Sequence, residues 1–167
     1  MNERGKFSPE TMVQLVNFRL GGEDFGLNIS TVREITRVTN ITHVPDAPSF
    51  IRGVTNLRGE IIPVIDLGVQ FGFARRDELK KSSRIVVTEI GEQTVGVLVD
   101  EVPEVSSLPS ANIEPPPEIV QRKIRRDYIK GVGKLGEKLV IILDLEKVLA
   151  EQDVQDMARV GAPEPQS

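Results

Sequence analysis

The sequence predicts an all-β protein built from two copies of one small closed barrel of five short strands. The segment SFIRGVTNLRGEIIPVIDLGVQF (49–71) returns without a gap as DYIKGVGKLGEKLVIILDLEKVL (127–149). A second match pairs EDFGLNISTVREI (23–35) with QTVGVLVDEVPEV (93–105). In both, alternating apolar residues between Gly- and Pro-containing turns indicate half-buried strands. Closure of each copy into a barrel removes the exposed edges of an open sheet.

The first elements of each copy are predicted to be hairpins. QLVNFRL (14–20) ends at Gly21-Gly22, and RIVVTEI (84–90) ends at Gly91. Each of these strands precedes a second strand across a tight Gly turn, as in a short β-hairpin. A short turn then carries an acidic and an apolar residue in both copies, Glu34 and Ile35 in the first and Glu104 and Val105 in the second.

The next elements are a Pro-rich connection and a final strand pair. The connection grows from THVPDAPS (42–49) to LPSANIEPPPEIVQRKIRRD (108–127), which has room for one or two helical turns. Pro63 is expected at a sheet edge or bulge, because it lacks an N–H donor. LVIIL (139–143) is apolar on both faces, so we expect the other copy to cover its outer side.

The repeat predicts two subdomains, 13–78 and 79–149, after a flexible N-terminus (1–12). Residues 74–83 have the charged composition of a linker, and 150–167 are expected to form a helix end and a disordered tail. A unit of about 65 residues buries only roughly 60% of its surface on folding, so the two units should pack together with a groove between them.

Composition excludes several classes of protein. With 39% hydrophobic and 28% charged residues, and no apolar run near the roughly 20 needed for a membrane span, the chain is typical of a globular cytoplasmic protein. The absence of cysteine excludes a disulfide scaffold or thiolate metal site. A net charge of −4 and 4% aromatic residues disfavour nucleic-acid binding, although small barrels often have that function.

No residue pattern predicts catalysis. GVGKLG (131–136) matches a dinucleotide-binding turn, but a strand follows it where that motif requires a helix, so a nucleotide-dependent enzyme is the remotest alternative. His43 is the only histidine and has no nucleophile to activate. Asp66 and Asp144 occupy equivalent strand ends, where a carboxylate caps the following turn. We therefore expect no enzyme activity, no catalytic residue, no cofactor and no metal.

The differences between the copies indicate function. Glu34 and Ile35 correspond to Glu104 and Val105, but Arg58 corresponds to Gly136. A side chain that the fold requires should appear in both copies. Arg58 is therefore either a solvated turn residue or free to present its rigid fork of donors at an interface.

The string GVTNLRGEIIPVIDL, with FGLNISTVREI, VPDAPSFIRG and VGVLVDEVPEV, strongly resembles the CheW family of chemotaxis coupling proteins. The resemblance covers about residues 13–149 in the same order. It implies two five-stranded SH3-like barrels packed together, with a short C-terminal helix. It also implies a non-catalytic adaptor that couples methyl-accepting chemotaxis receptors to the histidine kinase CheA in membrane-associated signalling arrays.

The resemblance further implies two sets of binding residues. A receptor helical hairpin would occupy the groove between the barrels, in a helix-in-groove mode; the matching positions are Ile29, Val32, Gly53, Arg58, Val99 and Val105. The CheA regulatory domain would contact the first barrel at Glu34 and Ile35, and the second near Glu114 and Ile119. The family pattern predicts a basic residue where this chain has Glu114. An adaptor for a pathway other than motility, or a fragment of a larger CheA-like or CheV-like protein, has the same features.

Overall fold

The computed structural model describes residues 11–73, 79–121 and 124–149, which form two sheets. We call the six-stranded one sheet A and the five-stranded one sheet B. Sheet A contains β8 (Glu101–Pro109), β1 (Met12–Leu20), β2 (Glu23–Asn28), β11 (Lys138–Leu143), β10 (Ile129–Leu135) and β9 (Ile113–Glu114), in that spatial order. Sheet B contains β3 (Val32–Arg37), β6 (Arg84–Ile90), β7 (Gln93–Val99), β5 (Glu60–Asp66) and β4 (Ile51–Leu57).

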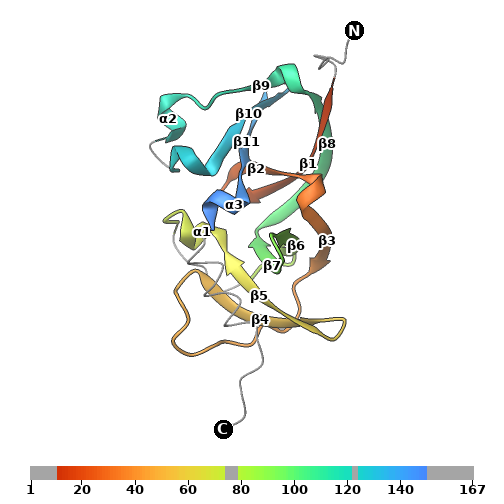
Figure 1. The fold of residues 1–167 in the computed structure, drawn as a ribbon, viewed down its shortest axis with the longest axis vertical. Helices are drawn as coiled ribbons and strands as arrows, with labels where there is room; N and C mark the ends of the chain where they lie inside the picture. The colour runs from red at the N-terminus through yellow and green to blue at the C-terminus, as the bar shows by residue number, and fades with distance from the viewer. Residues whose placement is uncertain (1–10, 74–78, 122–123, 150–167) are drawn as a thin grey trace.

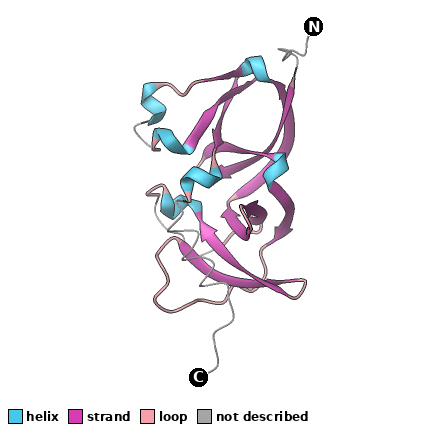
Figure 2. Ribbon diagram, in the orientation of Figure 1, coloured by secondary structure: helices cyan, strands magenta, loops and turns pink. Residues whose placement is uncertain are grey.

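Short helical turns connect these strands (Figures 1 and 2). They are η1 (Ile29–Thr31), α1 (Leu67–Gln70), η2 (Ser110–Asn112), α2 (Glu118–Gln121), η3 (Arg126–Tyr128) and α3 (Leu145–Val148). The all-β class and the two packed β units are thus confirmed, with the two-residue strand β9 as an addition to sheet A. Most of the expected C-terminal helix and tail, and part of the 74–83 linker, lie outside the described residues.

The two repeats exchange hairpins, which the sequence did not reveal. In each repeat the first hairpin pairs with the last hairpin of the other repeat, through the parallel contacts β2–β11 and β5–β7. Sheet B therefore runs from Val32 to Val99, and sheet A combines strands from both ends of the chain. The expected division into 13–78 and 79–149 does not match the sheets, because equivalence in sequence does not say which copy of a strand is the partner.

Sheet B closes on itself through the segment that follows β3. Thr42 and Val54 exchange backbone hydrogen bonds of 2.7 and 2.9 Å. The Thr55 hydroxyl donates to the Asn40 carbonyl at 2.8 Å. At Gly53 an added Cβ would clash with the Thr42 carbonyl, so the close approach of these two backbones requires glycine. Gly53, which the resemblance placed in the receptor site, is therefore also required for the closure of sheet B.

Three apolar clusters stabilise the fold. One fills sheet B around Val64 and Val87, and another fills sheet A around Leu15 and Val140. The largest lies between the sheets and takes residues from both, including Phe18, Phe25, Ile51, Val86, Val97 and Leu143. The alternating residues of β11 face two different clusters, with Ile142 inside sheet A and Ile141 against the central cluster. Both faces are therefore covered from Val140 to Leu143, as expected, whereas Leu139 at the start of the run is 57% exposed.

The strand-end carboxylates cap the turns that follow them, as expected. Asp66 accepts a hydrogen bond from the Val69 N–H at 3.3 Å, and Asp144 accepts one from the Lys147 N–H at 3.3 Å. These side chains satisfy amide groups that a helix start leaves without a partner. Residues 131–136 form the end of β10 and the turn to β11, so the glycine pattern belongs to a strand–turn–strand unit.

Pro63 differs from the expectation of an edge or bulge position. It lies in β5, between β4 and β7. Pairing with β7 begins one residue later, at Val64, so the missing N–H group removes no rung of that ladder. Among the described residues, the helices are all too short to cross a lipid bilayer.

Candidate interaction surface

The structure distributes the predicted receptor-binding residues between the surface and the core. Ile29 and Val105 are 37% and 51% exposed, whereas Val99 is 1% exposed and Gly53 is buried. Val32 is half-buried against the central cluster. Val99 and Gly53 therefore present no side chain at an open surface, and any effect they have on a partner passes through packing.

The exposed members lie along one side of the molecule. In Figure 1, β8, the η1 turn and β3 follow one another down this side. Ile29 is on η1, which contacts β1 of sheet A and β6 of sheet B. Val105 is on β8 and Ile35, which is 38% exposed, is on β3. Both β3 and β8 are edge strands of their sheets.

Ile35 and Val105 occupy the same position in the two repeats. Ile35 pairs with Val86 of β6, and Val105 pairs with Val16 of β1. Paired residues in a ladder point to the same face of a sheet. Val86 belongs to the central cluster, so Ile35 extends the buried layer between the sheets to the surface. We call Ile29, Ile35 and Val105, together with the Arg58–Glu34 and Lys138–Glu104 ion pairs of the same edge strands, the β3–β8 surface.

Arg58 forms an ion pair with Glu34, which precedes Ile35 in β3. Arg58 and Gly59 form the two-residue turn between β4 and β5, with φ values of 55° and 86°. A left-handed conformation is uncommon for residues other than glycine. At the equivalent turn Gly136 has a φ of 63°. The turn in sheet B therefore has an arginine in a left-handed conformation, where the equivalent turn in sheet A has a glycine, which adopts that conformation without strain.

Lys138 provides a counterpart to Arg58 that sequence comparison missed. Its Nζ lies 3.8 Å from Glu104 Oε2, and Glu104 is the equivalent of Glu34. In both sheets, a cation near the last hairpin turn therefore faces an acid on the edge strand. Lys138 follows Gly136 by two positions, so an alignment without gaps pairs Arg58 with the glycine and hides the common arrangement.

The second predicted kinase contact lies in sheet A. Glu114 on β9 forms an ion pair with Lys134 at 2.6 Å, and Ile119 on α2 is 70% exposed. Ile119 borders a mostly apolar hollow of about 240 Å³, which Phe25, Phe73 and Ile141 also line. The chain thus has exposed apolar side chains at both predicted kinase contacts.

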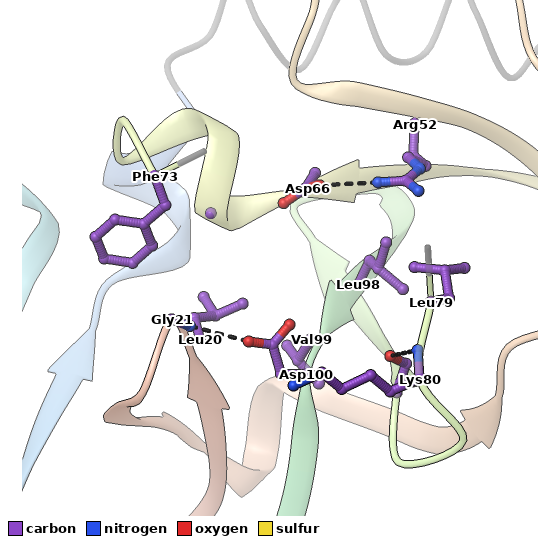
Figure 3. A pocket seen from close by; sticks show the side chains of 12 residues that line it. Leu20, Gly21, Arg52, Asp66, Phe73, Leu79, Lys80, Leu98, Val99 and Asp100 are labelled. Carbon is purple, nitrogen blue, oxygen red and sulfur yellow. Dashed lines mark hydrogen bonds and ion pairs between the residues drawn. The ribbon is translucent and has the colours of Figure 1, made fainter. Parts of the chain in front are cut away.

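A hollow of about 280 Å³ lies between the sheets (Figure 3). Three of its charged groups have partners within the protein: Arg52 pairs with Asp66 at 3.3 Å, and Asp100 accepts from the Gly21 N–H at 2.9 Å. Val99 contributes to its wall. The arrangement is that of a structural junction between β5, β7 and the β1–β2 turn. No group of three or more potential metal ligands occurs in the described ranges.

Comparison with known proteins agrees with this architecture. Residues 14–153 match the model of the CheW-like domain. The chain is 37% identical over 150 residues to the chemotaxis protein CheW of Klebsiella aerogenes, covering 89% of each chain. It is 31% identical over 151 residues to the CheW of Treponema pallidum, covering 88% of each.

A solved structure agrees as well. The crystal structure of the scaffolding protein TtCheW from Thermoanaerobacter tengcongensis superposes with a TM-score of 0.76 and 36% sequence identity, over 92% of this chain and 96% of that one. Fold, sequence and the duplicated hairpins thus lead to one assignment. The chain belongs to the CheW family of chemotaxis proteins.

Proposed function

We propose that this protein is a non-catalytic adaptor that holds methyl-accepting chemotaxis receptors and the kinase CheA together. The observation that carries the proposal is the β3–β8 surface, where Ile29, Ile35 and Val105 expose apolar side chains across both sheets. Its relatives carry the name of a chemotaxis protein, and one is described as a scaffold. The protein would act in the cytoplasm, recruited to receptor arrays.

The receptor contacts the part of this surface around Ile29, Arg58 and Val105. A helical hairpin needs an apolar strip with a polar rim, and these residues provide both. Arg58 is 75% exposed at its side chain, so its guanidinium can donate hydrogen bonds to a partner while Glu34 orients it. Val32, Gly53 and Val99 support the site from beneath, through packing and backbone shape.

The kinase regulatory domain contacts Glu34 and Ile35 on sheet B, and a second kinase domain contacts Glu114 and Ile119 on sheet A. Two contacts at different ends allow each adaptor to join two kinase domains, as in a ring or array. Because Glu34 pairs with Arg58, the receptor contact and the first kinase contact share one ion pair. A change at one contact therefore affects the other through a shared side chain.

Co-sedimentation with receptor-containing membranes and CheA tests the proposal. We expect the wild-type protein to bring kinase into the pellet and to change its autophosphorylation rate. Arg58→Ala and Val105→Trp should lower receptor binding, and Ile35→Ala should lower kinase binding, with unchanged melting temperatures. Glu92→Ala, an exposed change in the β6–β7 turn, serves as the control. A wild-type protein that leaves kinase in the supernatant would refute the adaptor role.

A further inference from the structure

The apolar interiors of the two sheets do not explain why the repeats exchange hairpins. Each first hairpin pairs on both sides with strands of the other repeat: β1 with β8 and β2 with β11 in sheet A, and β6 with β3 and β7 with β5 in sheet B. The equivalent inward positions of both sheets hold aliphatic side chains of similar size: Leu15 and Ile85, Val140 and Ile62, Ile142 and Val64. A barrel made from a single repeat, which we call the unexchanged pairing, would therefore bury similar apolar surface.

Polar side chains, in contrast, cross the four exchanged strands of sheet A. Asn17 on β1 is 2% exposed, and its Nδ2 donates to Ser106 Oγ at 3.0 Å and to Glu104 Oε2 at 3.5 Å, both on β8. Lys138 Nζ on β11 lies 3.8 Å from Glu104 Oε2 and 3.8 Å from Asp24 Oδ1 on β2. These contacts join strands of the first repeat to strands of the second.

The strand registers place these side chains on one face. Asn17 pairs with Glu104 on β8 and with Gly26 on β2, and Gly26 pairs with Ile142 on β11. Ile142 belongs to the cluster inside sheet A. Alternate residues of a strand point to the same face, so Lys138, four residues before Ile142, points inward as well.

Arg19 on β1 extends this set of contacts. Its Nε donates to Asp24 at 3.2 Å and its Nη1 donates to Glu101 on β8 at 3.0 Å. These hydrogen bonds, first to Asp24 and then to Glu101, raise the pKa of Arg19. Asp24 thus lies between two cations, Arg19 and Lys138. The full set, which we call the sheet A network, is Asn17, Arg19, Asp24, Glu101, Glu104, Ser106 and Lys138.

The equivalent positions of sheet B have residues that cannot form this network. Glu60 forms an ion pair with Arg33 at 3.3 Å instead, and its neighbour across the parallel β5–β7 contact is the uncharged Thr94. The substituted positions are Val87 for Asn17, Glu89 for Arg19, Thr94 for Asp24 and Glu60 for Lys138.

The unexchanged pairing would bring like charges together. With the β1–β2 hairpin beside β5, Glu60 would meet Asp24 in place of Thr94. With the β6–β7 hairpin beside β8, Glu89 would meet Glu101. Like charges on facing positions of neighbouring strands are destabilising, whereas opposite charges at these positions stabilise the pair. The charges therefore distinguish two pairings that the apolar residues do not.

We propose that the sheet A network selects the exchanged pairing of the hairpins, with Lys138 and Arg19 as the deciding residues. Polar groups that are satisfied in only one arrangement exclude alternatives of similar burial, often without adding stability. Asn17 fits this description, since its buried Oδ1 has no hydrogen-bond partner among the described residues. The selection acts between the repeats of one chain and does not depend on the adaptor role.

Distances between two labels distinguish the pairings, and the chain contains no cysteine that would interfere. Glu92 lies in the β6–β7 turn, and β7 runs beside β5 in the exchanged pairing but would run beside β11 in the unexchanged one. Ile61 on β5 and Leu139 on β11 are equivalent and are 47% and 57% exposed. In the otherwise wild-type chain, labels at Glu92→Cys and Ile61→Cys should be close, and labels at Glu92→Cys and Leu139→Cys more distant.

The deciding variant combines Lys138→Glu with Glu60→Lys. After refolding from urea, the fraction of molecules in the unexchanged pairing should rise about five-fold, which corresponds to about 1 kcal/mol. The matched control combines Lys130→Glu with Glu118→Lys, which keeps the net charge and changes two exposed residues that form no ion pair with a described residue. The control should refold with wild-type label distances. Equal distances in the two double variants would overturn the proposal.

Lys138→Gln is the milder variant if the double variant does not fold. It removes an attraction without adding a repulsion, so the unexchanged fraction should rise about two-fold while the melting temperature falls by only a few degrees. Lys138→Arg keeps the charge and should restore the wild-type distances. A lower melting temperature with unchanged distances would show that Lys138 acts on stability alone, and would overturn the proposal.

Discussion

The two crossovers between the sheets occupy equivalent places in the repeat but have different environments. The first runs through η1, where Ile29 is 37% exposed. The second passes directly from β7 to β8, where the equivalent residue Val99 is 1% exposed. Asp100 fastens the second crossover: its N–H donates to the Arg19 carbonyl at 2.9 Å, and its side chain accepts from Gly21. Duplication has thus provided one crossover for stability and left the other available for a partner.

The closure glycines give the largest expected contrast between the copies. Gly53 and Gly131 are equivalent, and an added Cβ at Gly53 meets the backbone of Thr42. At Gly131 it meets the Ile113 side chain at 2.7 Å and the Glu114 carbonyl at 3.0 Å. Because a side chain adjusts more easily than backbone, Gly53→Ala should cost more than about 3 kcal/mol and Gly131→Ala about 1–3 kcal/mol. Urea denaturation measures both, and equal costs would contradict this view of the closure.

The crossover residues themselves provide the next test. Val99→Ala should lower the free energy of unfolding by about 2–3 kcal/mol, since it removes buried methyl groups from the central cluster. Ile29→Ser should change it by less than about 0.5 kcal/mol, as expected for an exposed position. Receptor binding should show the opposite order, with the larger loss for Ile29→Ser in the same binding assay. A destabilised Ile29 variant would show that both crossovers are structural.

The capping carboxylates of the two copies differ in whether their charge has an ion-pair partner. Asp66 caps α1 and also pairs with Arg52, whose side chain is only 10% exposed. Asp144 caps α3 and forms no ion pair with a described residue. Asparagine retains the capping oxygen but not the charge. Asp66→Asn should therefore destabilise by about 1–3 kcal/mol and Asp144→Asn by less than about 0.5 kcal/mol. Equal thermal shifts would mean that the Arg52 pair contributes nothing.

The hairpin turns give the smallest expected contrast in stability between the copies. Arg58→Gly copies the residue found at Gly136 and should stabilise the fold by up to about 1 kcal/mol, because glycine adopts the left-handed conformation without strain. It should also weaken receptor binding, since the exposed guanidinium is lost. A calorimetric scan and the receptor assay on the same sample test both statements. Loss of stability would show that the pair with Glu34 matters more than the backbone.

Sequence reasoning predicted the features that depend on local chemistry or on strict repetition. The caps at Asp66 and Asp144 follow from carboxylates at equivalent strand ends, and the packing of Ile141 and Ile142 against two different clusters follows from a run that is apolar on both faces. The hairpin exchange could not be predicted in this way, because β5 and β11 resemble each other and either one could pair with β2.

The candidate site was predicted less completely than the fold. The exposure of Ile29 and Val105 agrees with a contact role, but the burial of Val99 does not follow from any local pattern, since Ile29 occupies the same place in the other repeat. Lys138 pairs with Glu104 although, in the ungapped alignment of the repeats, it lies two residues after the position equivalent to Arg58. Such pairs appear only when the sheets are assembled in three dimensions.

The exchange of hairpins has a consequence for synthesis on the ribosome. Sheet B is continuous from Val32 to Val99, so its strands can assemble as soon as that stretch has left the exit tunnel. The β1–β2 hairpin is made first, yet its neighbours β8 and β11 are made late. The β1–β2 hairpin therefore stays without its neighbours in sheet A until all the strands of sheet B have been made.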